Sequence, residues 1–196
     1  SRPGLGRGGN PPPAGAPASR PGGTDGVAQW ELAQSGATRI AGGTDVGLWV
    51  TKQRRTLTQV AFLNHCEDLS DISEMEDGFR IGAGVTMAEI MANRDLAFLA
   101  PVARIIGGPA VRSAATVGGN LFAEAPYGDF TTALLALDAS VRFAGESGQS
   151  TPLQDFLRDR ANRRGRVVES VMVPRITDPK ALRFVKVTRV KPKGAA

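Results

Sequence analysis

The sequence predicts a mixed fold, with an α/β part first and an α+β region after it. Short strand-like stretches alternate with helix-like stretches in the first part of the chain, and β-branched strand segments gather toward its end. Two glycine-rich turns, at residues 41–47 and 115–121, each follow a short apolar stretch and precede a segment that can begin a helix or a strand. The chain has 196 residues, of which 41% are hydrophobic, so it can bury a core as one domain or two small lobes.

Residues 1–26 differ in composition from the rest of the chain. Leu5 is the only large aliphatic side chain among them. The segment is rich in glycine, and its prolines are Pro3, Pro11, Pro12, Pro13, Pro17 and Pro21. Because such a segment buries too little apolar surface to fold, we expect it to be a linker or mobile arm outside the domain.

The first elements after this arm alternate between helix and strand. In order, they are a helix at 27–35, a strand at 37–41 that leads into the first glycine turn, a helix at 44–52, and strands at 59–63 and 79–83. Thr44 or Asp45 is expected to cap the second helix, since either side chain can accept a hydrogen bond from a free helical amide.

The next region begins with a capping box. Thr86 and Glu89 have the Thr-x-x-Glu spacing in which the hydroxyl accepts from the third helical amide and the carboxylate reaches back. Helices therefore follow at 87–93 and 96–106, before the second glycine turn. A helix at 129–137 and strands at 141–144, 167–173 and 182–190 complete the chain.

The first glycine turn can present unpaired amides to an anion. A strand that feeds Gly42 and Gly43 into a helix start brings free N–H groups and the positive end of a helix dipole to one point. Thr44 adds a hydroxyl donor, whereas the carboxylate of Asp45 is expected to turn inward and cap amides. The turn is neither a Walker loop nor the G-x-G-x-x-G fingerprint, so a plain strand-to-helix turn remains an alternative.

The second glycine turn has small polar residues at matching offsets. Thr116 precedes Gly118 and Gly119, and Asn120 follows them, although an Asn at this place can simply satisfy its own turn. Together, the two turns suggest a diphosphate held from both sides, as in a dinucleotide-like cofactor. Asp129 could then accept hydrogen bonds from sugar hydroxyls, or could only cap the helix that it begins.

Composition argues against several classes of function. The net charge is +5, yet aromatic residues are only 6% and do not interleave with the basic runs at 158–166 and 186–193, so no nucleic-acid interface is indicated. We interpret the basic runs as solvated loops or as a docking face for another subunit. No apolar run is long enough to span a membrane. Cys66 is the only cysteine, which excludes an internal disulfide and fits a reducing cytoplasmic compartment.

Both glycine turns and their flanks resemble one family. Residues 39–53, Arg-Ile-Ala-Gly-Gly-Thr-Asp-Val-Gly-Leu-Trp-Val-Thr-Lys-Gln, closely resemble the first flavin segment of bacterial xanthine dehydrogenase small subunits, and residues 111–121 resemble the second. The match continues at 77–86, Pro126, Asp129, 133–139 and 173–174. Over roughly residues 27–191 the chain is therefore similar to the FAD-binding subunit or domain of molybdenum hydroxylases, a group that includes the carbon monoxide dehydrogenase medium subunit.

The resemblance implies a fold and a domain division. The fold would be the two-lobed α+β FAD-binding fold of the PCMH (vanillyl-alcohol-oxidase-like) type. A small α/β lobe would cover about 27–86 and a larger mixed-sheet lobe 87–191. Residues 192–196 would be a tail, and the further C-terminal domain that is usual in the family is expected to be absent.

The resemblance also implies which residues bind FAD. The loop around the diphosphate would consist of Ile40, Ala41, Gly42, Gly43, Thr44, Asp45 and Val46, and the second loop would contribute Ala115, Thr116, Gly118, Gly119 and Asn120. Asp129 would bind the ribityl or ribose hydroxyls, Phe122 would pack against the isoalloxazine ring, and Lys186 would approach the flavin. Tyr127 could stack on the ring or take an ordinary core role.

The implied function is electron transfer. In this family electrons pass from a molybdenum centre through iron–sulfur clusters to FAD, which delivers them to NAD or another acceptor. The flavin carries the redox chemistry, so no catalytic residue and no metal ligand is expected on this chain. A [2Fe–2S] cluster takes four cysteines, so the clusters and the molybdopterin are expected on partner subunits or domains.

The resemblance leaves the substrate and the type of flavoprotein open. Closeness to xanthine dehydrogenases favours purine-type chemistry with NAD as acceptor. One alternative is a self-contained flavin oxidase of the same fold, which would need its own substrate pocket. Another is a cofactor-free interaction module in which the glycine loops serve only as turns.

Overall fold

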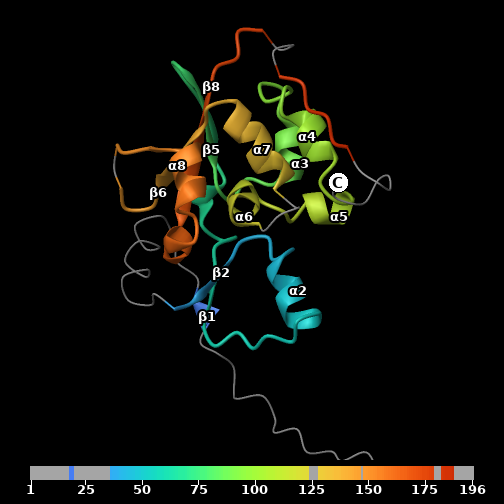
Figure 1. Ribbon diagram of the computed structural model, residues 1–196, viewed down its shortest axis with the longest axis vertical. Coiled ribbons are helices and arrows are strands. Elements are labelled where there is room, and N and C mark those ends of the chain that lie inside the picture. The colour runs from blue at the N-terminus through green and yellow to red at the C-terminus, as the bar shows by residue number, and fades with distance from the viewer. Residues whose placement is uncertain (1–17, 20–35, 124–127, 147, 179–181, 188–196) are drawn as a thin grey trace, which may run out of the picture.

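The structure is a computed structural model that describes residues 18–19, 36–123, 128–146, 148–178 and 182–187. Within these residues, a small parallel sheet and a larger antiparallel sheet form two lobes (Figure 1). The helix expected at 27–35 lies outside the described residues, as do Pro126 and Tyr127.

The small lobe has parallel strands in the order β1-β3-β2, namely β1 (Ala18–Ser19), β2 (Thr38–Ile40) and β3 (Val60–Phe62). The helix α2 (Val46–Thr51) connects β2 to β3 and lies below the larger lobe in Figure 1. Ala18 pairs with Val60 and Ser19 with Ala61, so the expected domain boundary at residue 27 is wrong for these two residues of the arm. Strand pairing uses backbone N–H and C=O groups, so a low content of apolar side chains does not exclude it.

The larger lobe is built on an antiparallel sheet. Its order is β4-β5-β8-β6-β7, formed by β4 (Ile72–Met75), β5 (Gly78–Gly82), β8 (Val168–Pro174), β6 (Ser140–Phe143) and β7 (Thr151–Pro152). The central strand β8 is mostly buried, with only its last residue exposed. Two 3₁₀ turns flank the sheet, η1 (Glu67–Leu69) and η2 (Asn162–Gly165).

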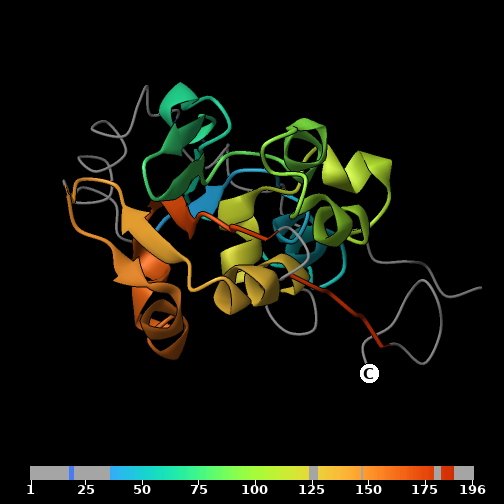
Figure 2. The same cartoon turned by 90° about the horizontal axis from the view of Figure 1, so that it is seen from above.

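Short helices surround this sheet. They are α3 (Met87–Ala92), α4 (Ala100–Arg104), α5 (Pro109–Arg112), α6 (Val117–Phe122), α7 (Asp129–Ala136) and α8 (Leu153–Arg158). In Figures 1 and 2, α3 to α7 gather on one side of the sheet and α8 lies beside β6. None of the helices in the described parts of the chain is long and apolar enough to cross a membrane.

One apolar core joins the large sheet to its helices, and it includes the fully buried rings of Phe130, Phe143 and Phe156. A second, smaller cluster lies between the lobes and consists of Leu63, Cys66, Leu69, Ala144 and Val167. Ala41 of the first glycine turn packs against this smaller cluster. The first turn is therefore anchored to the larger lobe as well as to its own sheet.

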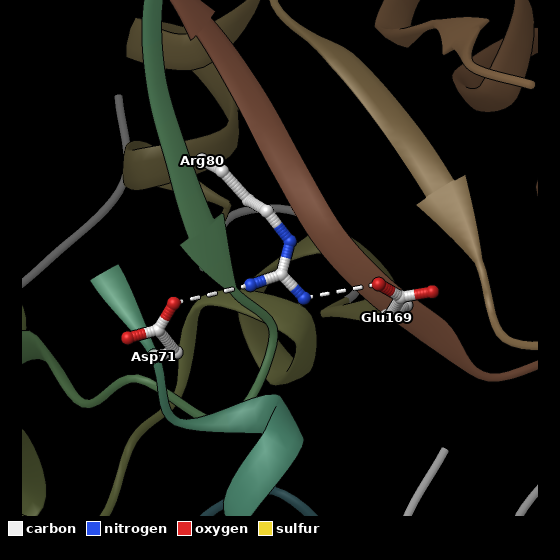
Figure 3. Close-up of polar contacts among 3 residues, drawn as sticks. All are labelled: Asp71, Arg80 and Glu169. Atoms are coloured by element: carbon white, nitrogen blue, oxygen red, sulfur yellow. Dashed lines mark hydrogen bonds and ion pairs between the residues drawn. The ribbon is translucent and has the colours of Figure 1, made fainter. Parts of the chain in front are cut away.

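A cross-strand ion pair reinforces the large sheet. Arg80 on β5 donates from Nη2 to Glu169 Oε1 on β8 at 3.0 Å and from Nη1 to Asp71 Oδ2 at 3.4 Å (Figure 3). The side chains of Arg80 and Glu169 are only 17% and 18% exposed, whereas Asp71 is 59% exposed. Because screening by water is weaker in the more enclosed pair, the bond to Glu169 is the stronger tie between the strands.

Most of the expected elements are present, with bounds that differ by a few residues. The Thr86 capping box is confirmed, since Glu89 N donates to the Thr86 hydroxyl at 3.2 Å and Glu89 Oε2 accepts from Thr86 N at 2.7 Å. The helix expected at 96–106 is shorter and becomes α4. The helices α5, α6 and α8 and the strands β4 and β7 were not anticipated.

The strand expected at 182–190 is wrong over its described part. Residues 182–187 have the alternating burial of a strand, with Leu182 and Phe184 packed on the core and Val185 and Val187 exposed. They pair with none of the described strands. Alternating burial with a period of two therefore indicates an extended chain that packs one face on the protein. Such a chain becomes a β-strand only where it also forms backbone hydrogen bonds with the edge of a neighbouring strand.

Candidate cofactor-binding site

The first glycine turn leaves a row of backbone amides without acceptors among the described residues. Gly43 adopts the left-handed conformation, with φ +68, which lets the chain turn sharply between β2 and α2. From Gly43 to Val46, no backbone amide donates to any described residue. The turn therefore offers consecutive N–H donors at the start of a helix, an arrangement that suits an anion.

Asp45 does not take the role expected of it. It occupies the N-cap of α2, yet its side chain makes no capping hydrogen bond. Its backbone is already helical, with φ −89 and ψ −48. Capping side chains act from an extended backbone, which aims the side-chain oxygen back at the second or third helical amide, so the helical backbone of Asp45 explains why it does not cap α2.

The second glycine turn is the first turn of α6, and its amides are occupied. Thr116 has the extended backbone of a cap, and its hydroxyl accepts from Gly119 N at 3.1 Å. Val117 N donates to Val85 O at 2.9 Å and Gly118 N to Ala83 O at 2.8 Å. The expectation that both glycine turns present free amides thus holds for the first turn and is wrong for Val117, Gly118 and Gly119.

The two turns nevertheless meet. A Cβ on Gly42 would lie 1.7 Å from Ala114 O and 3.2 Å from Ala115 N, so only glycine permits this approach. Ala115 is in turn tied to the larger lobe, because its carbonyl accepts from Met87 N at 2.9 Å. The residues before the second turn therefore pack against the first, open turn and hold it in place.

Asn120 links α6 to α7. Its Oδ1 accepts from both Thr131 N and Thr131 Oγ1 at 3.0 Å, and the Thr131 hydroxyl also lies 3.0 Å from the Asn120 carbonyl oxygen. Both residues are buried. Asn120 thus satisfies the first turn of α7, and it fixes Asp129, the first residue of α7, relative to the glycine turn.

Asp129 and Lys186, two of the expected site residues, contact each other. Lys186 Nζ lies 2.6 Å from Asp129 Oδ2, and the two side chains are 29% and 17% exposed. Asp129 is the first residue of α7, after the N-cap Gly128. Among the described residues only Lys186 contacts its carboxylate, through Oδ2, which leaves Oδ1 available to a hydroxyl donor. The pair also ties the extended segment 182–187 to α7.

Phe122 is the last residue of α6 and is partly buried. Its ring meets the edge of Phe156 on α8, with centroids 5.3 Å apart and planes at 80°. Arg160, which the sequence analysis placed among solvated basic residues, donates from Nη1 to Ala123 O at 3.0 Å and to Leu121 O at 3.4 Å. Nothing in the local sequence indicated this contact, because Ala123 and Leu121 lie 37 and 39 residues before Arg160 in the chain.

Comparison with known proteins identifies the family. Residues 17–176 match the family described as the FAD binding domain in molybdopterin dehydrogenase. The chain belongs to this family. The glycine turns, Asn120, Phe122 and Asp129 all lie within the matched residues, and Lys186 lies beyond them.

Relatives of this FAD-binding family extend the comparison. The xanthine dehydrogenase FAD-binding subunit of Escherichia coli O157:H7 is 30% identical over 126 residues, which is 61% of this chain and 43% of that protein. The chain thus spans less than half the length of this relative. Quinoline 2-oxidoreductase from Pseudomonas putida 86 has a TM-score of 0.75 at 22% identity, covering 93% of this chain and 66% of that chain. Carbon monoxide dehydrogenase from Hydrogenophaga pseudoflava has a TM-score of 0.74 at 20% identity, covering 82% and 59%.

The residues of the first turn fit the cofactor that the family description names. FAD carries a diphosphate, and the free amides from Gly43 to Val46 are donors of the kind that a diphosphate requires. The exposed hydroxyl of Thr44 adds a further donor at the same place. Beyond the turn, the carboxylate of Asp129 and the ammonium of Lys186 place one hydrogen-bond acceptor and one cation beside each other.

Proposed function

We propose that this chain is the FAD-binding electron-transfer module of a molybdenum-containing hydroxylase or dehydrogenase. The observation that carries the proposal is the open first glycine turn set against the second turn by the Gly42 contact. A turn with purely structural duties would be expected to satisfy its amides internally, as the second turn does. Membership of the FAD-binding family supports the same conclusion.

The protein residues would bind and orient the cofactor. Amides from Gly43 to Val46 would hold the diphosphate, and Asp129 would accept hydrogen bonds from sugar hydroxyls. FAD, once bound, supplies the redox chemistry by accepting single electrons and releasing a pair. Lys186 would place a positive charge close to the isoalloxazine ring, which favours the reduced, negatively charged form of the flavin.

Electrons would reach the cofactor from other polypeptides or domains. Cys66 is the only cysteine and is buried, so this chain cannot ligate an iron–sulfur cluster by itself. We infer partner subunits or domains that carry the [2Fe–2S] clusters and the molybdopterin, with NAD or another molecule as the final acceptor and the cytoplasm as the compartment. Similarity to a xanthine dehydrogenase subunit supports purine-type chemistry at the molybdenum centre.

The visible absorption spectrum of the purified chain tests the proposal. We expect bound FAD at one per chain, released by heat and identified by chromatography, or taken up when apoprotein is titrated with FAD. Reduction by small substrates without partner subunits would instead indicate a self-contained flavin oxidase. A chain that binds no FAD, even with partner subunits present, would show that the turns are only structural.

Lys186 provides a more specific test of ring tuning. In Lys186→Met the loss of a nearby cation is expected to lower the flavin midpoint potential, measured by dye-linked reductive titration. Arg183→Met is the matched control, since Arg183 is an exposed cation three residues earlier in the same extended segment. Equal potentials in wild type and Lys186→Met would remove Lys186 from this role.

A further inference from the structure

The C-terminal end of α6 is bound by a guanidinium from a distant part of the chain. Arg160 donates to Leu121 O and Ala123 O, the carbonyls on either side of Phe122. The last carbonyls of a helix have no partner within it, and they lie at the negative end of the helix dipole. A partly buried cation that donates to two of them therefore fixes the backbone that carries Phe122.

A second contact holds the side chain of the same residue. The Phe122 ring meets the fully buried Phe156 at 80°, an edge-to-face arrangement that specifies the orientation of both rings. Phe156 also lies 6.1 Å from Phe143 of the sheet, so its own position is fixed by the core. Phe156 belongs to α8, which ends two residues before Arg160. Backbone and ring of Phe122 are thus both set from α8 and the loop that follows it.

Arg160 stands apart from the neighbouring arginines in what it contacts. Arg158 pairs with Asp155, Arg163 with Asp159, and Arg166 with Glu146. The pairs of Arg158 and Arg163 are local, within four residues, whereas Arg166 reaches Glu146 in the turn after β6. Arg160 instead reaches the helix that begins with the second glycine turn.

We propose that Arg160 and Phe156 are positioning residues that hold Phe122 against the cofactor ring and so set the environment of the flavin. This inference rests on the proposed function, because it takes Phe122 as the residue that faces the isoalloxazine. It assigns to the loop after α8 a role in the cofactor site. Neither Arg160 nor Phe156 is expected to touch the cofactor through the contacts described above, since both act on Phe122.

The test compares Arg160→Met with Arg160→Lys and with Arg158→Met, the last being an exposed arginine of the same basic run. Each variant is measured for thermal unfolding without cofactor, FAD dissociation constant, visible circular dichroism of the bound flavin and midpoint potential. For Arg160→Met we expect about tenfold weaker FAD binding, from the loss of a charged hydrogen bond, and an altered visible dichroism. Arg160→Lys should recover part of both, and Arg158→Met should match wild type.

The outcomes separate a positioning role from a structural one. If Arg160→Met lowers only the unfolding temperature, while saturated flavin keeps the wild-type dichroism and potential, the inference is overturned. If Arg160→Met does not fold, Phe156→Leu decides, because it removes the ring contact and leaves the guanidinium in place; an unchanged flavin spectrum would then overturn the inference. Wild-type protein that binds no FAD would overturn the proposed function itself.

Discussion

The two glycine turns have similar sequences and opposite hydrogen-bonding states. In the first, amides from Gly43 to Val46 donate to no described residue. In the second, Val117 and Gly118 donate to the carbonyls of Val85 and Ala83, which follow β5, and Gly119 donates to the Thr116 hydroxyl. One turn is therefore open to a ligand and the other is part of the scaffold.

The conformation of the cap residue underlies part of this difference. Thr116 is extended, with φ −104 and ψ 160, so its hydroxyl reaches the amide of Gly119. Asp45 is helical and leaves the amides of α2 uncapped. The rest comes from the surroundings, because Ala83 and Val85 place their carbonyls beside the second turn. A glycine pair alone thus indicates a sharp turn, and its neighbours decide whether the turn is free to bind.

The largest expected effect comes from separating the two turns. In Gly42→Val the new side chain would collide with the backbone of Ala114 and Ala115, so the turns must move apart. We expect the free energy of unfolding to fall by about 3 kcal/mol and FAD binding to be lost. Urea unfolding and an FAD titration measure both effects.

The control for this substitution is Gly36→Ala. Gly36 precedes β2, and a Cβ there would meet no atom within 4 Å. Stability and FAD affinity should therefore remain close to those of wild type. A Gly42→Val protein that binds FAD normally would contradict the view that contact between the turns forms the site.

An intermediate effect is expected from cutting the link between the second turn and α7. Asn120→Ala leaves the buried amide of Thr131 without its acceptor, which should lower the free energy of unfolding by about 2 kcal/mol. Because Asp129 begins α7, FAD affinity should fall as well. Thr132→Ala is the matched control, since that exposed hydroxyl contacts only Gly128 O among the described residues. Equal stability of the two variants would show that Asn120 is not the link.

The smallest effect compares the two cap residues directly. Thr116→Val removes the capping oxygen of α6 while keeping the side-chain shape, at an expected cost of about 1 kcal/mol. Asp45→Ala removes a side chain that makes no capping bond. The free energy of unfolding, measured by thermal unfolding, should therefore change by no more than a few tenths of a kcal/mol. Comparable losses in the two variants would mean that Asp45 caps α2 in solution.

Local sequence patterns predicted elements well where the elements are determined locally. The capping box at Thr86, the strand β5 and the helix α7 lie within a few residues of their expected positions. The prediction of a strand at 182–187 is wrong because this segment packs on the apolar core without pairing to a described strand edge. Propensity can describe the shape of a chain segment, but only the fold decides what lies next to it.

The features of the site also differ in how far the sequence predicts them. Glycine positions located both turns, and the family resemblance predicts the roles of Phe122, Asp129 and Lys186. The amides consumed in the second turn and the reach of Arg160 depend on contacts between residues far apart in sequence, such as Gly118 with Ala83. No spacing rule encodes such contacts, so they had to be read from the structure.

The pairing of β1 with β3 has a practical consequence for handling this protein. A shortened chain beginning at residue 27 would lack Ala18 and Ser19 and would expose the edge of β3 at Val60 and Ala61. Uncovered strand edges recruit other chains, so such a product should self-associate more readily than one that retains β1. Two residues in a stretch dominated by proline and glycine therefore protect the small sheet against aggregation.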